Sequence, residues 1–177
     1  MSQNKTAILF LLKLTFFTGA MIISVHGTAQ ECEYEKNEID ALTELVVKRT
    51  VPEILLRING QPVYIKGQSI GTNKYLKVQY YKYSNYVIQE DREVAFVLSN
   101  DEEVTLFPRP MPVDSTKMND YSDLSTLLIF KLNDEQFQKL KSTPIVLFKY
   151  HLISGFVEEP IKGAKQLRLM ELLHCLE

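Results

Sequence analysis

Hydrophobic and polar residues alternate with a period of two along most of the chain, which is typical of half-buried β-strands. In 74–83, the longest such stretch, Leu76, Val78 and Tyr80 share one face. The pattern predicts further strands over 42–51, 54–58, 63–66, 92–98, 104–107, 124–132 and 145–152. The run 124–132 is almost wholly apolar, so we expect that strand to be buried on both faces.

The ends of the strands are marked by residues that favour turns. Asn59-Gly60 tolerates the positive φ of a tight hairpin and predicts a turn between two strands. Pro108, Pro110 and Pro112 predict an extended connection, because proline cannot donate to a central strand. The acidic stretch 31–40 lacks the alternation, and we expect a solvated arm or a small opening turn there.

Two stretches predict helices. Asn133 can cap a short helix over 134–141, with Gln136 reaching back to it and Pro144 ending it. The last stretch, 160–177, places four leucines at helical spacing on one face: Leu169, Leu172, Leu173 and Leu176. The sequence therefore predicts an α+β fold, a mostly antiparallel sheet of about six to eight strands with one short helix and a C-terminal helix packed on the sheet.

The N-terminal segment differs from the rest of the chain. A polar start is followed by the apolar run 7–25 and by the small residues Gly27 and Ala29, the order found in secretory signal peptides. We expect cleavage after Ala29, with residues 1–29 as signal peptide and 30–177 as a single domain. An uncleaved anchor helix and a lipid-anchored Cys32 are the alternatives.

Composition and charge narrow the function classes. The chain has 177 residues, of which 45% are hydrophobic and 24% charged, as in ordinary globular domains. Loss of Lys5 and Lys13 with the signal peptide changes the net charge from −2 to −4. A mildly acidic domain is poorly suited to nucleic acid, whose phosphates require clustered positive charge.

The two cysteines, Cys32 and Cys175, stand near opposite ends of the expected mature chain. In an exported protein such a pair favours a disulfide over free thiols. A metal pair and a catalytic thiol are the alternatives. The metal pair is disfavoured because His174 beside Cys175 is the sole further ligand at a suitable spacing. We expect no metal and no cofactor.

One cluster of side chains suggests a binding surface. Tyr75, Tyr81 and Tyr83 fall on the same face of the 74–83 strand as Lys77, where they could stack on a sugar ring or contact a protein. The alternative is structural, since tyrosine favours half-buried strands without any ligand.

Catalytic motifs are missing from the sequence. It has no nucleophile elbow, no H-E-x-x-H, no glycine-rich phosphate loop and no C-x-x-C pair. A pair of carboxylates is all that a glycosidase requires, so an enzyme stays open, although we name no catalytic residue. The acidic loop 99–103 lacks the glycine and the ligand spacing of a calcium loop.

Four short segments carry a resemblance to known sequences: 32–40 (CEYEKNEID), 132–137 (LNDEQF), 141–145 (KSTPI) and 173–176 (LHCL). In these the chain resembles a loose group of small uncharacterised secreted proteins of Bacteroidetes. The resemblance implies export and a domain of sheet plus helix, and it implies no activity.

We therefore expect a protein that is secreted or periplasmic and that acts as a non-enzymatic binding or structural module. Its partner would be a protein or a glycan, and a membrane would be contacted only through the N-terminal segment before cleavage. One alternative is a hydrolase acting on a polysaccharide or peptidoglycan fragment. Another is a periplasmic inhibitor or immunity-type protein that uses the acidic loop 100–103.

Overall fold

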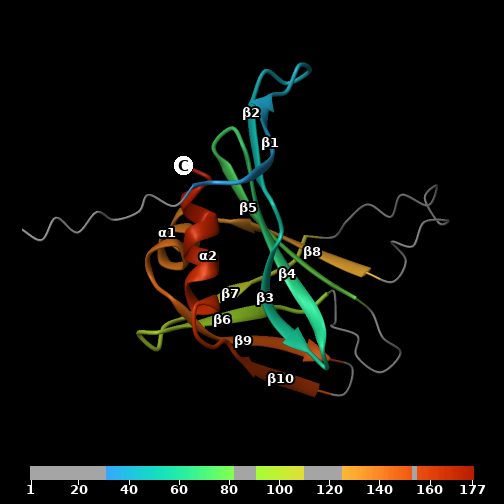
Figure 1. The fold of residues 1–177 in the computed structure, drawn as a ribbon, viewed down its shortest axis with the longest axis vertical. Coiled ribbons are helices and arrows are strands. Elements are labelled where there is room, and N and C mark those ends of the chain that lie inside the picture. The colour runs from blue at the N-terminus through green and yellow to red at the C-terminus, as the bar shows by residue number, and fades with distance from the viewer. Residues whose placement is uncertain (1–30, 82–90, 110–124, 153–154) are drawn as a thin grey trace, which may run out of the picture. The chain divides into compact units, whose positions relative to one another are not determined.

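The structure, a computed structural model, describes residues 31–81, 91–109, 125–152 and 155–177, all of which belong to one compact unit, Glu31–Glu177 (Figure 1). In chain order its elements are β1 (Tyr34–Ile39), β2 (Val46–Thr50), β3 (Glu53–Ile58), β4 (Gln61–Ile70), β5 (Asn73–Tyr81), β6 (Val94–Leu98), β7 (Glu103–Leu106), β8 (Ser125–Leu132), α1 (Asp134–Ser142), β9 (Ile145–Leu152), β10 (Gly155–Pro160) and α2 (Lys165–His174).

These strands form two sheets in which every pair is antiparallel. The first sheet has six strands in the order β1-β2-β4-β5-β8, with β3 also paired to β4. The second has four, in the order β10-β9-β6-β7. The mostly antiparallel α+β fold with a C-terminal helix is thus confirmed. The expectation of one sheet is wrong, because β6, β7, β9 and β10 pair with one another and not with the first sheet.

The first sheet contains a break that matters for the candidate site. β4 pairs with β3 over its first half and with β2 over its last three residues, so β2 and β3 follow one another along the same edge. Pro52 lies between them and has no N–H to donate to a strand ladder. The Thr50 hydroxyl instead accepts a hydrogen bond from the Gly67 N–H at 3.0 Å. The sheet is therefore interrupted at Pro52.

A single cluster of buried side chains joins both sheets and both helices. The first sheet contributes one of its faces, and α1 and α2 contribute their apolar faces. Representative members are Val63, Ile65, Leu76, Val78 and Phe130 from the first sheet, Phe96, Phe148 and Tyr150 from the second, and Phe137, Leu140, Leu169 and Leu173 from the helices. The opposite face of the first sheet is thus left outside this core.

The terminal helix is shorter than the sequence predicts. The prediction began at residue 160, but β10 continues through Pro160 and α2 begins at Lys165. The four leucines at helical spacing are all buried, as expected. α2 lies close to β4 at Gly67, where an added Cβ would come within 2.6 Å of the Leu172 side chain. Glycine at this position allows the helix to approach the sheet.

The short helix α1 agrees with its prediction. Asn133 caps it, since its side chain accepts a hydrogen bond from the Gln136 N–H at 2.8 Å. The Gln136 side chain accepts in turn from the Asn133 N–H at 3.0 Å, which completes a capping box.

The acidic start of the described chain is a strand and not a solvated arm. β1 pairs with β2 in a hairpin, and residues 42–45, expected to be strand, connect the two. The turn is held by the Asp40 carboxylate, which accepts hydrogen bonds from the N–H groups of Leu42 and Thr43 at 3.1 and 2.9 Å. These hydrogen bonds keep the pKa of Asp40 below its usual range. Leu42 at the tip is 95% exposed.

The apolar strand β8 is buried on one face and not on both. Leu128 and Phe130 lie in the core, whereas Leu127 and Ile129 are half-buried on the opposite face. β5 is the strand with which β8 pairs, so β8 lies at an edge of the first sheet. Its hydrophobic outer residues belong to the face of the first sheet that is turned away from the core.

The predicted disulfide is confirmed. Cys32 and Cys175 are bonded with a Cα–Cα distance of 5.6 Å and a sequence separation of 143. The Tyr34 hydroxyl also donates to the Cys175 carbonyl at 2.7 Å, so β1 is attached to the end of α2 twice. In the chain-entropy model, closing a loop of this size stabilises the fold by about 5 kcal/mol.

The predicted signal peptide, residues 1–29, and the prolines Pro110 and Pro112 lie outside the described residues. Neither α1 nor α2, the helices of the described chain, has the length and apolar character needed to span a membrane.

Candidate functional site

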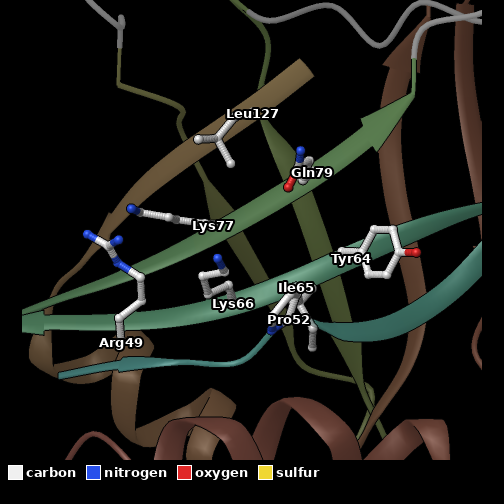
Figure 2. Close-up of a pocket in the computed structure, with 8 residues that line it drawn as sticks. All are labelled: Arg49, Pro52, Tyr64, Ile65, Lys66, Lys77, Gln79 and Leu127. Carbon is white, nitrogen blue, oxygen red and sulfur yellow. The ribbon is translucent and has the colours of Figure 1, made fainter. Parts of the chain in front are cut away.

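A pocket of about 200 Å³ lies on the face of the first sheet that is turned away from the core, above the break at Pro52 (Figure 2). Four strands and the segment between β2 and β3 line it. The lining residues are Arg49 of β2; Pro52 between β2 and β3; Tyr64, Ile65 and Lys66 of β4; Lys77 and Gln79 of β5; and Leu127 of β8. Because β2 ends at Thr50, no strand backbone fills the space beside Lys66, and the pocket opens there.

Arg49 is the most unusual residue of this pocket. Its Nε is buried, yet it has no hydrogen-bond partner in the part of the chain that the structure describes. A buried polar atom without a partner costs about 1 to 3 kcal/mol, more when the group is charged. Native proteins rarely retain such an atom unless it meets water, an ion or a ligand.

Two lysines face Arg49 across the sheet. The register places Lys66 directly opposite Lys77, an arrangement of like charges that destabilises an antiparallel pair. Lys66 is compensated by Glu35 of β1, whose Oε1 lies 2.7 Å from its Nζ. Lys77 forms no ion pair with the described residues. The cluster therefore combines three cations with a single paired carboxylate.

The electrostatics of Lys77 reflect this crowding. Partial burial is the main cause that lowers the pKa of its ammonium group. The positive charges of Arg49 and Lys66 lower the pKa further, and the carboxylate of Glu35 opposes them. The ammonium group of Lys77 would thus be stabilised by an anion that enters the pocket.

The other walls of the pocket are neutral. Figure 2 shows the charged ends of Arg49 and Lys77 at one end and Tyr64 with Gln79 at the other, and the register pairs Tyr64 with Gln79 across the two strands. Leu127 lies opposite Gln79 on β8. The pocket therefore has a cationic end and an end formed by an aromatic ring, an amide and aliphatic carbon.

Of the four binding residues expected from the sequence, the structure places Lys77 in the pocket. Tyr75 shares its face but does not line the pocket, and its ring lies under the Arg109 guanidinium at 5.9 Å. Tyr81 ends β5 opposite Ser125, and its side chain is not described. Tyr83 lies outside the described residues. A continuous tyrosine-lined surface on this strand thus stays a prediction.

Sequence reasoning missed Arg49, Tyr64, Lys66 and Gln79. Gln79 had a signal, because it follows Lys77 by two positions and so shares its face. Arg49, Tyr64 and Lys66 come from two other strands, and single-strand alternation carries no information on which strands become neighbours.

Acidic residues do not form a buried pair in the described chain. The buried polar side chains there are Thr50, Gln68 and Ser69, none of which is an acid, and no group of acids, histidines and cysteines suited to a metal ion is found among those residues. In the acidic loop, Glu102 lies 3.3 Å from Lys139 and Glu103 lies 2.7 Å from Lys149. These ion pairs leave less free charge for a basic partner protein.

Comparison of the chain with family models, with curated proteins and with solved structures finds no match.

Proposed function

We propose that this chain is an exported, non-enzymatic binding module that takes an anionic ligand in the pocket above the strand break. The observation that carries the proposal is the buried Nε of Arg49, which has no partner in the described chain although it lies beside Lys77. An anion that draws the Arg49 side chain toward the pocket would supply the missing acceptor.

The net charge of the cluster supports binding over a purely structural role. Arg49, Lys66 and Lys77 carry three positive charges, and Glu35 compensates one of them. The remaining excess of two destabilises the empty sheet, because like charges lie close together outside bulk water. Residues that lower stability locally are typical of functional sites.

Arginine suits this role for a geometric reason. Its guanidinium is planar, always charged, and offers Nε and Nη as a fork that matches two oxygens of a carboxylate or phosphate. Lys77 adds a point charge from β5 at the same end of the pocket.

The test is an NMR titration of the ¹⁵N-labelled protein with sodium acetate and with sodium sulfate at constant ionic strength. We expect saturable shifts at the amides of Arg49, Lys66 and Lys77. Arg49→Gln should weaken binding by about tenfold or more, because hydrogen bonds to charged groups contribute about 1.5 to 3 kcal/mol.

Lys131→Gln is the matched control. Lys131 is exposed on the same face of the sheet, opposite Tyr75, and lies outside the pocket lining. Its loss removes the same charge without touching the pocket, so its binding should stay within about twofold of the wild type. Equal weakening by both substitutions, or shifts that never saturate, would reject the proposal.

A further inference from the structure

We infer that the anion is the carboxylate of a sugar acid, one acidic pyranose residue of a glycan, and this inference rests on the proposed function. A sugar acid would contact both the cationic end of the pocket and its neutral walls, whereas a simple anion would contact the cationic end alone.

The size of the pocket restricts the ligand first. Sites for drug-sized molecules measure about 300 to 1,000 Å³, whereas this pocket is about 200 Å³. It holds one ring with its substituents and not an extended oligomer or a peptide segment. The neighbouring residues of a glycan would lie outside the pocket.

The walls then restrict the chemistry. The ring of Tyr64 and the aliphatic carbon of Pro52 and Leu127 offer apolar surface in the same pocket as the cations. A free phosphate or sulfate would satisfy Arg49 but would leave this surface in contact with water. A pyranose acid presents C–H groups on its ring faces, which pack on aromatic and aliphatic surface, and a planar carboxylate, which matches the guanidinium fork.

The amide of Gln79 adds the third requirement. It lies opposite Tyr64 in the register, away from the charged end of the pocket (Figure 2). An amide offers both a donor and an acceptor, which is the combination that a sugar hydroxyl requires. The carboxylate would thus meet Arg49 at one end of the pocket, and the ring face and a hydroxyl would meet Tyr64 and Gln79 at the other end.

The experiment compares six probes by calorimetry and NMR on the same protein. Three are sugar acids: methyl glucuronide, methyl galacturonide and N-acetylmuramic acid. The controls are acetate for charge alone, inorganic phosphate for a compact anion, and methyl glucoside for a neutral ring. We expect at least one sugar acid to bind about tenfold tighter than acetate, phosphate and methyl glucoside.

Two substitutions at Tyr64 separate the ring from the charge. Tyr64→Leu should remove most of the preference for the sugar acid while acetate binding stays the same, which also shows that the pocket is still folded. Tyr64→Phe keeps the ring and should retain the preference.

The outcomes distinguish the two proposals. Acetate or phosphate binding as tightly as all three sugar acids would overturn the sugar inference and leave the anion site in place. Binding of methyl glucoside equal to that of the sugar acids would overturn it as well. No binding of any charged probe would overturn the proposed function together with the inference.

Discussion

Strand β5 carries two lysines in contrasting surroundings. Lys74 points to the side of α2, donates to the backbone oxygen of Leu176 and lies 5.7 Å from the centre of the Phe137 ring. Lys77, three positions on, points to the opposite face and forms no ion pair with the described residues. Burial lowers the pKa of both.

The surroundings of each lysine explain the difference. Near α2, Lys48 donates to the backbone oxygen of Glu177 and Lys141 pairs with its carboxylate. The positive charges on that side meet acceptors from the protein itself. In the pocket, Arg49 Nε and the Lys77 ammonium group meet no such acceptor among the described residues, although both side chains belong to the same sheet. A partly buried lysine can therefore be structural on one face of the sheet and point to a ligand on the other.

The largest expected effect concerns the structural side. Cys175→Ser removes the bond to Cys32 and should lower the free energy of unfolding by about 2 to 5 kcal/mol. Chemical denaturation in urea measures the change. Cys32→Ser should cost the same amount, and the double variant should cost no more than either one, since both remove the same bond. Additive losses would mean that the cysteines contribute separately.

Gly67→Ala tests how closely α2 approaches the sheet. The added methyl would meet the buried Leu172 and Leu176 side chains, so we expect a loss of about 1 to 3 kcal/mol from overpacking. Gly60→Ala cannot serve as the control, because Gly60 has a positive φ of 81° and an alanine there would be strained without any packing clash. Gly67→Ala should cost less stability in a Leu172→Ala background than in the wild type, because the added methyl then meets a smaller side chain. An unchanged midpoint for Gly67→Ala in the wild type would contradict the close contact.

Replacing each lysine of β5 by methionine tests whether Lys74 and Lys77 contribute differently to stability. Lys74→Met loses a hydrogen bond and a cation–π contact and should lower stability by about 1 kcal/mol. Lys77→Met removes a charge that faces Arg49 and Lys66, so stability should stay the same or rise by about 0.5 kcal/mol. Loss of stability of the same size in both variants would contradict the distinction.

The smallest expected effect is a change of folding stability with pH that depends on Lys77. The groups that act on the pKa of Lys77 are Arg49 and Lys66, which lower it after burial, and Glu35, which raises it. Because the pKa of Lys77 is lower in the folded state than in the unfolded state, the folded state binds fewer protons at pH values between the two pKa values. Stability therefore rises with pH across that window, and the stability difference between Lys77→Met and the wild type should shrink.

Urea denaturation at intervals between about pH 7 and pH 10, below and into the usual lysine range, measures this trend. Anion affinity should fall over the same window, because the ligand favours the charged lysine. A stability difference that does not change with pH would contradict the lowered pKa of Lys77.

The sequence predicts the parts of this fold that depend on local patterns. The capping box at Asn133, the leucine face of α2 and the strand character of 74–81 all follow from spacing within one segment. Two strands were misjudged because their environment is set from elsewhere. β1 has too few apolar residues to alternate and is held by pairing with β2 and by the disulfide. β8 places apolar side chains on the outer face of the sheet, where Leu127 lines the pocket.

The candidate site was found in part for the same reason. Lys77 was recognised because it lies within a strongly alternating strand. Arg49 came from a strand that ends at a proline, and its role depends on the break beside β4. The register that places Lys66 opposite Lys77 is a property of paired strands, which one strand by itself does not reveal.

The bond between Cys32 and Cys175 makes nearly the whole described chain a covalent ring. A protease that cuts one connecting loop would open this ring without releasing a fragment, and the two pieces would separate only after reduction. The bond also holds β1, and with it Glu35, in place beside Lys66. A nicked molecule that keeps the bond would thus retain the carboxylate that balances the pocket, so damage to a loop need not mean loss of binding.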